Sequence, residues 1–206
     1  MGMRIFIYGE DGFTNSTLAN SLSILGLDVI GEIDNEIVAF NLITHHCPDA
    51  VLLLIDHGHI RAIELARIIR KNFPNMGIVL ATKSEDIRLI GIDVKRLPNG
   101  VLIEQISKHG DLDKLKLTIE KSINSTQMQV DFHRCKYLSD PQIETLRLMA
   151  EGNANSEIAK MRYVSEKSVE QMLTRTALIL GIAFDRQHNS RVRLLNSYYE
   201  LVNGRR

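Results

Sequence analysis

The sequence predicts an α/β domain with a doubly wound parallel sheet, followed by a smaller all-α domain. Across residues 1–123, short apolar runs alternate with segments whose apolar residues recur at helical spacing, whereas residues 137–206 show helical spacing alone. The formal charge also changes sign, since residues 1–130 carry 13 basic and 16 acidic side chains and residues 131–206 carry 12 and 9. Residues 124–136 are polar and lack apolar periodicity, so we interpret them as a linker.

Five short apolar runs predict the strands of the sheet. The run Ala50–Ile55 is apolar throughout, which is typical of a parallel strand buried on both faces. The other predicted strands are Arg4–Tyr8, Asp28–Gly31, Gly77–Thr82 and Gly100–Ile103. Helical periodicity predicts the segments Thr14–Leu25, Glu36–His46, Ala62–Asn72 and Leu112–Ile123. Because strands alternate with helices, we expect a sheet of order 2-1-3-4-5 with helices on both faces. Residues 85–98 are weakly patterned.

The composition is that of an ordinary globular protein. The 206 residues include 25 basic and 25 acidic ones, and 44% are hydrophobic. These values exclude a disordered chain and a wholly basic nucleic-acid coat protein. No apolar stretch reaches about 18 residues and no signal-peptide pattern opens the sequence, so we expect a cytoplasmic protein without a membrane partner. The two cysteines, Cys47 and Cys135, make no disulfide framework.

Two groups of histidines contain residue types that suit zinc, His45-His46-Cys47 and His57-Gly58-His59. Their spacing matches no established zinc pattern, so we interpret them as exposed histidines and predict neither a metal nor another cofactor. The sequence also lacks a Ser-His-Asp set and a phosphate-binding glycine loop. An enzyme is therefore not expected.

Capping residues divide the C-terminal domain into four predicted helices. Ser139 is expected to cap the first helix, with Gln142 completing a capping box and Gly152 ending the helix. Asn155 or Ser156 is expected to cap the second. The later helices are predicted at Glu157–Met161, from Ser165 to about Leu180, and at Ser190–Val202, with a turn at Tyr163-Val164. A short helix, a tight turn and a longer helix make a helix-turn-helix.

These helices resemble the LuxR/NarL-type (GerE-type) DNA-binding domain over residues 138–182. The matching motifs are Leu138-Ser139, Ala150-Glu151-Gly152, Asn155-Ser156-Glu157-Ile158-Ala159 and Val164-Ser165-x-x-Ser168-Val169. The resemblance implies that the third helix enters the major groove of double-stranded DNA, with Glu170, Gln171 and Thr174 facing the bases. The DNA-binding residues implied outside the base-reading set are Asn155, Ser156, Lys160, Ser165, Lys167, Ser168 and Arg175.

Several positions depart from this family pattern. Glu170 stands where the family usually has lysine, and Leu178 and Ile179 stand where it often has lysines. We therefore expect fewer phosphate contacts, a lower affinity and a flatter salt dependence. Residues 183–189 form a longer loop than usual before the last helix, which the family uses for dimerisation.

Over about residues 3–123, the element order resembles the receiver domain of bacterial response regulators. The resemblance implies an aspartate phosphoacceptor at the end of the third strand, but Leu54 occupies that position and has no nucleophilic oxygen. Glu10 and Asp11 retain carboxylates of the acidic pair, Thr82 retains a hydroxyl, and Glu104 replaces a lysine. We predict a receiver-like domain that is not phosphorylated on aspartate.

An alternative is a displaced phosphorylation site that uses Asp56 with Glu10 and Asp11. A shift of two residues moves a side chain about 6–7 Å along a strand, which makes this arrangement the less favoured one. The residual pocket could instead bind a small ligand or serve in dimerisation.

Two functions are compatible with these patterns. The first is a bacterial transcription regulator that dimerises, binds double-stranded DNA and needs no aspartyl phosphorylation. The second is a partner-dependent adaptor that forms heterodimers with another regulator and binds DNA weakly or not at all by itself. Glu170, Leu178 and Ile179 distinguish them, because lysines at these positions should raise DNA affinity only if the domain docks in the family manner.

Overall fold

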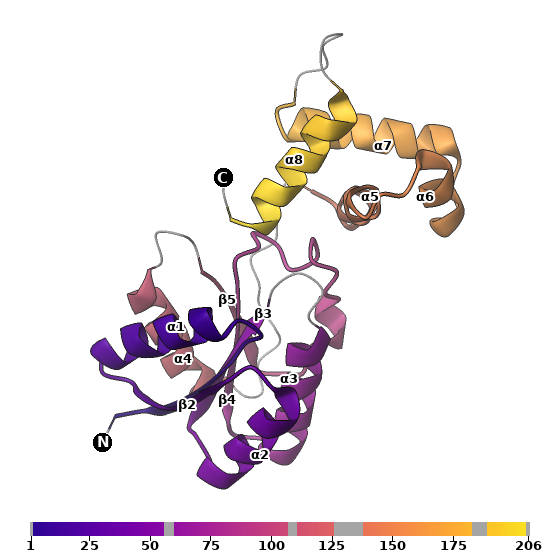
Figure 1. The fold of residues 1–206 in the computed structure, drawn as a ribbon. Coiled ribbons are helices and arrows are strands. Elements are labelled where there is room, and N and C mark those ends of the chain that lie inside the picture. The colour runs from indigo at the N-terminus through magenta and orange to yellow at the C-terminus, as the bar shows by residue number, and fades with distance from the viewer. Residues whose placement is uncertain (1, 56–59, 107–110, 126–137, 183–188, 205–206) are drawn as a thin grey trace. The chain divides into compact units, whose positions relative to one another are not determined.

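The structure is a computed structural model, and it describes residues 2–55, 60–106, 111–125, 138–182 and 189–204 (Figure 1). The chain divides into two compact units. The sheet unit comprises Met1–Lys83 and Asp93–Phe132, and the helical unit comprises Ser84–Ile92 and His133–Arg206. Most of the predicted linker at 124–136 and of the loop at 183–189 lies outside the described residues.

The sheet unit contains a five-stranded parallel sheet of order β2-β1-β3-β4-β5, which confirms the predicted topology. The strands are β1 (Arg4–Tyr8), β2 (Asp28–Ile33), β3 (Ala50–Ile55), β4 (Gly77–Thr82) and β5 (Val101–Gln105). Strand β2 is longer than predicted because Glu32 and Ile33 pair with the end of β1. Every residue of β4 is buried, as are all but Leu54 in β3, so this sheet is covered on both faces.

Four helices cover the sheet, with α1 and α4 on one face and α2 and α3 on the other (Figure 1). Their bounds are α1 (Gly12–Ile24), α2 (Glu36–His46), α3 (Ile60–Asn72) and α4 (Leu112–Asn124), and a 3₁₀ turn follows β4 at Val94–Arg96. Helix α1 begins before the predicted Thr14, because the Asp11 carboxylate caps it by accepting from the Phe13 N–H at 3.1 Å and from the Thr14 hydroxyl.

The helical unit contains α5 (Asp140–Ala150), α6 (Asn155–Met161), α7 (Glu166–Ile179) and α8 (Ser190–Val202). Gln142 accepts from the Ser139 N–H at 2.9 Å, as expected for a capping box at the start of α5. The expected cap of α6 is wrong, because Ala154 is its N-cap. The Glu157 carboxylate accepts from the Ala154 N–H at 2.7 Å, so the first turn is stabilised without a polar side chain at the cap.

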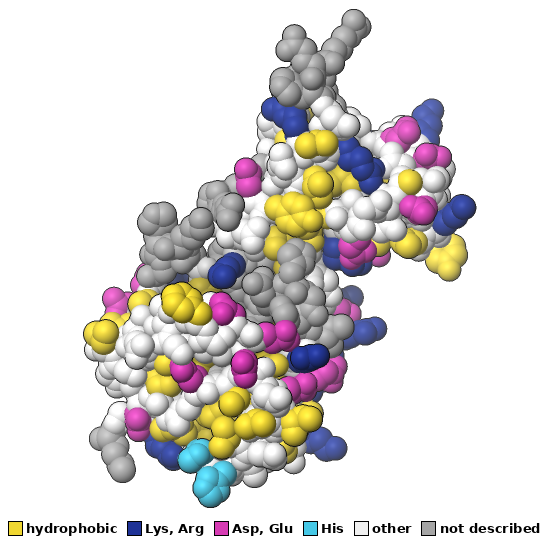
Figure 2. Space-filling model, viewed as in Figure 1, with side chains coloured by type: hydrophobic (Ala, Val, Ile, Leu, Met, Phe, Trp, Pro, Cys, Tyr) yellow, Lys and Arg dark blue, Asp and Glu magenta, His cyan; other side chains and the backbone are white. Residues whose placement is uncertain are grey.

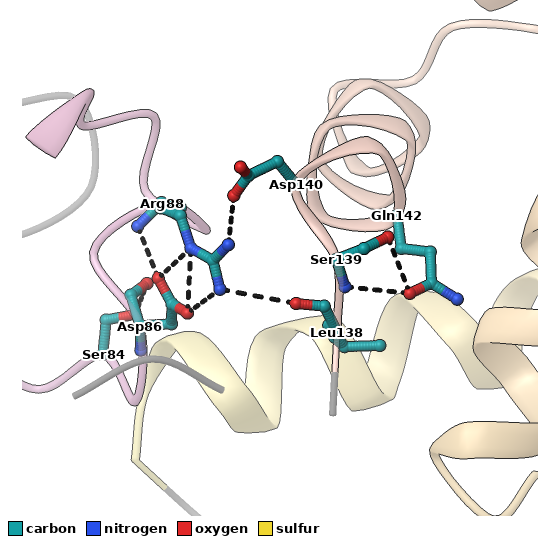
Figure 3. Close-up of polar contacts among 7 residues, drawn as sticks. All are labelled: Ser84, Asp86, Arg88, Leu138, Ser139, Asp140 and Gln142. Carbon is teal, nitrogen blue, oxygen red and sulfur yellow. Dashed lines mark hydrogen bonds and ion pairs between the residues drawn. The ribbon is translucent and has the colours of Figure 1, made fainter. Parts of the chain in front are cut away.

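A segment that follows β4 in the sequence is part of the helical unit (Figure 3). We call Ser84–Ile92 the arm. The Arg88 guanidinium donates to the Asp86 carboxylate, with its Nη2 atom 2.6 Å from Oδ2, and its other side donates to Asp140 at the start of α5. The backbone N–H of Arg88 also donates to Asp86, at 2.9 Å. Hydrogen bonding to Asp86, and then to Asp140, raises the pKa of Arg88.

Two further hydrogen bonds join the arm to α8. The Tyr198 hydroxyl donates to the Leu89 carbonyl oxygen at 2.8 Å, and the Glu85 N–H donates to the Leu201 carbonyl oxygen at 3.0 Å. The side chains of Leu89 and Tyr198 are buried. The arm therefore contributes both apolar and polar contacts to the helical unit, although it lies about 50 residues before α5 in the sequence.

We expect Arg88→Ala to lower the free energy of unfolding of the helical unit by about 3 kcal/mol. The Asp86 side chain has no exposed surface, so the substitution leaves a buried carboxylate without its cation. Urea denaturation measures the change. The exposed pair Arg96–Asp93 supplies the control, since Arg96→Ala should cost less than about 1 kcal/mol. If Asp86→Ala combined with Arg88→Ala were as destabilising as Arg88→Ala alone, the buried charge would not be the cause.

Burial raises the pKa of the Tyr198 phenol from 10.0 to about 12. The unfolded chain therefore releases this proton at a lower pH than the folded chain, so the free energy of unfolding falls as pH rises from 10.0 to about 12. In Tyr198→Phe this part of the decline should disappear. Denaturation at a series of pH values measures the free energy of unfolding of both proteins. If this free energy changed with pH equally in both, Tyr198 would not be the group responsible.

Candidate nucleic-acid interface and sheet-edge pocket

Helix α7 presents one polar, exposed face and one buried face. Its start is fixed by Ser165, whose hydroxyl accepts from the Ser168 N–H at 3.2 Å. The buried face consists of Val169, Leu173, Thr176 and Ala177. The exposed face contains Lys167, Ser168, Glu170, Gln171, Thr174 and Arg175. The spacing of these positions places Lys167, Gln171 and Thr174 on one side of the helix, as a helix that enters a groove requires.

The residues predicted on α6 differ in their surroundings. Ser156 and Lys160 are exposed, whereas Asn155 is half-buried. The Asn155 side-chain oxygen accepts from Arg191 of α8 at 2.9 Å, and Arg191 also donates to the Asn153 carbonyl oxygen. This contact orients the Asn155 amide, whose NH₂ group is the part that can donate to a phosphate. Sequence reasoning missed Arg191, because it lies 36 residues from its partner.

The cations of the helix-turn-helix are not equally available. The Arg162 side chain is 10% exposed and donates to Glu144 at 3.1 Å and to the Thr145 hydroxyl, so it joins α6 to α5. Lys160, Lys167 and Arg175 are exposed. Leu178 and Ile179 at the end of α7 are 63% and 44% exposed, so apolar groups lie on the surface where the family resemblance implies lysines.

A cavity of about 320 Å³ lies at the carboxyl ends of β1, β3 and β4. Its polar lining consists of Glu10, Asp11, Thr14, Thr82 and Lys83, and its apolar lining consists of Gly9, Leu54, Ile55, Ala81 and Ile106. Open α/β sheets bind ligands at this edge, where the strand order reverses. Three of the predicted pocket residues, Glu10, Asp11 and Thr82, are therefore brought together, and Asp56 lies outside the described residues.

Leu54 lines this cavity, whereas Glu104 is not part of its lining. Leu54 lines it with hydrocarbon, beside Ala81 in the sheet register. Glu104 is 6% exposed and is bound by α4, since it accepts from the Thr118 hydroxyl at 2.8 Å and pairs with Lys114. The cation of the lining is instead Lys83, which sequence reasoning missed although it directly follows Thr82.

Local hydrogen bonds hold one carboxylate of the lining in its charged form. The Thr14 hydroxyl and then the Phe13 and Thr14 N–H groups donate to Asp11 and lower the pKa of its carboxyl. Asp11 thus has a structural role as the cap of α1. Within the described ranges, no three His, Cys, Asp or Glu side chains are grouped as a metal would require, and His57, His59 and Cys135 fall outside them. No described helix is long and apolar enough to cross a membrane.

Comparison with known proteins finds solved structures that share this fold over nearly the whole chain. No family model matches the chain. A Pseudomonas aeruginosa protein named "Putative transcriptional regulator" is 23% identical over 184 residues, covering 79% of this chain and 87% of the relative. A solved structure of two RcsB dimers bound to two parallel DNAs is 20% identical, with a TM-score of 0.56 and coverage of 98% of this chain and 100% of that one. A second structure, the two-component response regulator RcsB–DNA complex, is 23% identical with a TM-score of 0.55 and covers 98% and 100%.

The likeness to RcsB extends over both units and shows the fold. It confirms the predicted combination of a doubly wound parallel sheet of order 2-1-3-4-5 with a helical C-terminal domain.

Proposed function

We propose that this protein is a DNA-binding transcriptional regulator that acts as a dimer and without aspartyl phosphorylation. The main observation behind the proposal is that α7 has an exposed polar face opposite a buried, mainly apolar contact face. The transcriptional regulator of Pseudomonas aeruginosa and the DNA-bound RcsB structures support it. Such a regulator acts on DNA in the cytoplasm and is not an enzyme.

The exposed side chains of α7 suit the major groove. Gln171 can pair with both hydrogen-bonding atoms of an adenine edge, and the Glu170 carboxylate can accept from the amino group of cytosine. The Thr174 side chain offers a methyl group and a hydroxyl to neighbouring bases. Lys160, Lys167 and Arg175 then contact phosphates, which position the helix without reading sequence.

Helix α8 supports the dimer. Val192 and Tyr199 are 51% and 44% exposed and lie seven residues apart, so they share one side of the helix. Figure 2 shows hydrophobic side chains gathered along the α8 part of the helical unit. A symmetric pair of helical units would read two half-sites about one helical turn of DNA apart.

Two side chains at the carboxyl edge of the sheet support independence from aspartyl phosphorylation. The strand-end position that implies a phosphoacceptor is the hydrocarbon side chain of Leu54, and the position that implies a bridging lysine is Glu104, which is bound by α4. A phosphoryl group here would also lie near the carboxylates of Glu10 and Asp11, and the described part of the lining offers no third carboxylate to help bind a divalent cation between them.

The partner-dependent adaptor remains the second candidate because of the surface of α7. Glu170 adds a negative charge in the middle of the face that would meet DNA, and Leu178 and Ile179 add exposed hydrocarbon at its end. A heterodimer with a more basic regulator would reduce the number of phosphate contacts that this chain has to make.

Selection of bound duplexes from random DNA should recover a palindrome with the full-length protein. The three exposed cations on α6 and α7 of each subunit, Lys160, Lys167 and Arg175, predict a slope of about −5 for log affinity against log salt in a dimer. Gln171→Ala should lower affinity roughly tenfold and relax the base preference at one position in each half-site. No enrichment of any sequence would shift the assignment to the adaptor.

We expect Glu170→Lys to raise DNA affinity and to make the salt slope steeper by about two, one phosphate contact for each subunit of a dimer. Glu120→Lys makes the same charge change on α4 and serves as the control. Fluorescence anisotropy at several salt concentrations measures both variants. Equal responses to the two substitutions would show that α7 does not meet the DNA.

Incubation with acetyl phosphate and magnesium should leave the protein unmodified on a phosphate-retarding gel, because Leu54 cannot form an acyl phosphate. A retarded band that is absent from Asp56→Ala would contradict this expectation and assign a displaced site to Asp56.

A further inference from the structure

The turn between α6 and α7 contains a tyrosine that packing does not explain. Tyr163 is 96% exposed, so its ring makes almost no contact with the rest of the described structure. Its φ angle is +54°, in the left-handed region. Two backbone hydrogen bonds hold the turn, from the Tyr163 N–H to the Lys160 carbonyl oxygen at 3.3 Å and from the Val164 N–H to the Ala159 carbonyl oxygen at 3.0 Å.

The conformation of Tyr163 is unfavourable for its residue type. A side chain with a Cβ atom is strained in the left-handed region, where glycine is not. Because the phenol ring is exposed, it gains no stabilisation from burial that would offset this strain. Met161 and Val164 beside it are 56% and 41% exposed, so three large apolar side chains reach the surface within four residues. Strain and exposed apolar surface that coincide in this way mark a contact with another molecule.

The position of Tyr163 in the chain indicates which molecule this is. Residues 163–168 are exposed without interruption, so the surface continues from Tyr163 to Lys167 and Ser168 at the start of α7. The exposed Lys160 precedes it on α6. The first turn of a recognition helix enters the major groove, and the residues just before it therefore reach the sugar–phosphate backbone at the groove edge.

We propose that Tyr163 is a DNA-backbone contact, in which the phenolic hydroxyl donates a hydrogen bond to a phosphate and the ring lies against deoxyribose. Tyrosine is among the side chains that donate to phosphate oxygens. The contact is uncharged, so it adds affinity without releasing a counterion. It thus compensates for the few cations of α7. The assignment rests on the proposed DNA-binding function.

The test compares Tyr163→Gly and Tyr163→Phe in the full chain against the duplex selected with the natural protein. In Tyr163→Gly the thermal midpoint should rise by roughly 2–5 °C, because glycine adopts the left-handed conformation without strain. Its DNA affinity should fall about tenfold, with the salt slope unchanged. Tyr163→Phe retains the ring but not the hydroxyl, so its DNA affinity should fall about threefold.

Two further variants serve as comparisons. Lys167→Ala should flatten the slope by about two, and Phe13→Ala removes an 81% exposed ring from the sheet unit and should leave affinity unchanged.

Each other outcome overturns the assignment in a recognisable way. A higher thermal midpoint with unchanged affinity would assign the exposed cluster to a protein partner. A lower thermal midpoint would show that Tyr163 stabilises the fold. A flatter salt slope in Tyr163→Gly would show that its DNA affinity falls because neighbouring cations have moved away from the phosphates. Failure of the natural protein to bind any duplex would instead refute the proposed function of α7, and the Tyr163 contact with it.

Discussion

The constraint on which the sheet unit depends is that a parallel sheet must be covered on both faces. Helices α1 and α4 cover one face and α2 and α3 the other, so β3 and β4 are almost entirely buried. Polar chemistry is then confined to the carboxyl ends of the strands, where the cavity lies. There, the lining combines the hydrocarbon side chain of Leu54 with the polar groups of Thr82 and Asp11, while Glu104 is bound by α4. The sheet therefore keeps the receiver-type topology, while Leu54 replaces the aspartate that the resemblance implies.

Strand β4 connects the cavity, along the sequence, to the segment that belongs to the helical unit. Thr82 and Lys83 line the cavity, and the arm begins at the next residue, Ser84. The arm is fixed by the buried carboxylate of Asp86, which Arg88 neutralises, and loss of this cation would leave an uncompensated charge in the interior. The helical unit is consequently built from two separate stretches of sequence. Its organisation depends on a segment that an alignment of helix-turn-helix motifs alone would not include.

The topology could be predicted because short apolar runs, such as Ala50–Ile55, alternate along the chain with segments of helical periodicity. Contacts between distant residues could not, since Arg88 and Asp140 are 52 residues apart and no local pattern joins them. The cap of α6 was predicted wrongly because the Glu157 carboxylate reaches back to a backbone N–H, which needs no polar side chain at Ala154. Lys83 was missed because the family resemblance implies a lysine only after the fifth strand, whereas this lysine follows the fourth.

The charges of α7 constrain how the proposed regulator can recognise DNA. Lys167 and Arg175 are matched on the same helix by Glu166 and Glu170, so α7 has no net charge with which to attract a polyanion. Non-specific affinity depends almost wholly on such attraction and would therefore be low. The strength of uncharged contacts, such as that of the Gln171 amide with a base edge, does not depend on the net charge of α7, because such contacts depend on geometry. A helix of this composition is suited to discriminating between sequences, and in the proposed dimer the second subunit would supply the affinity that one helix lacks.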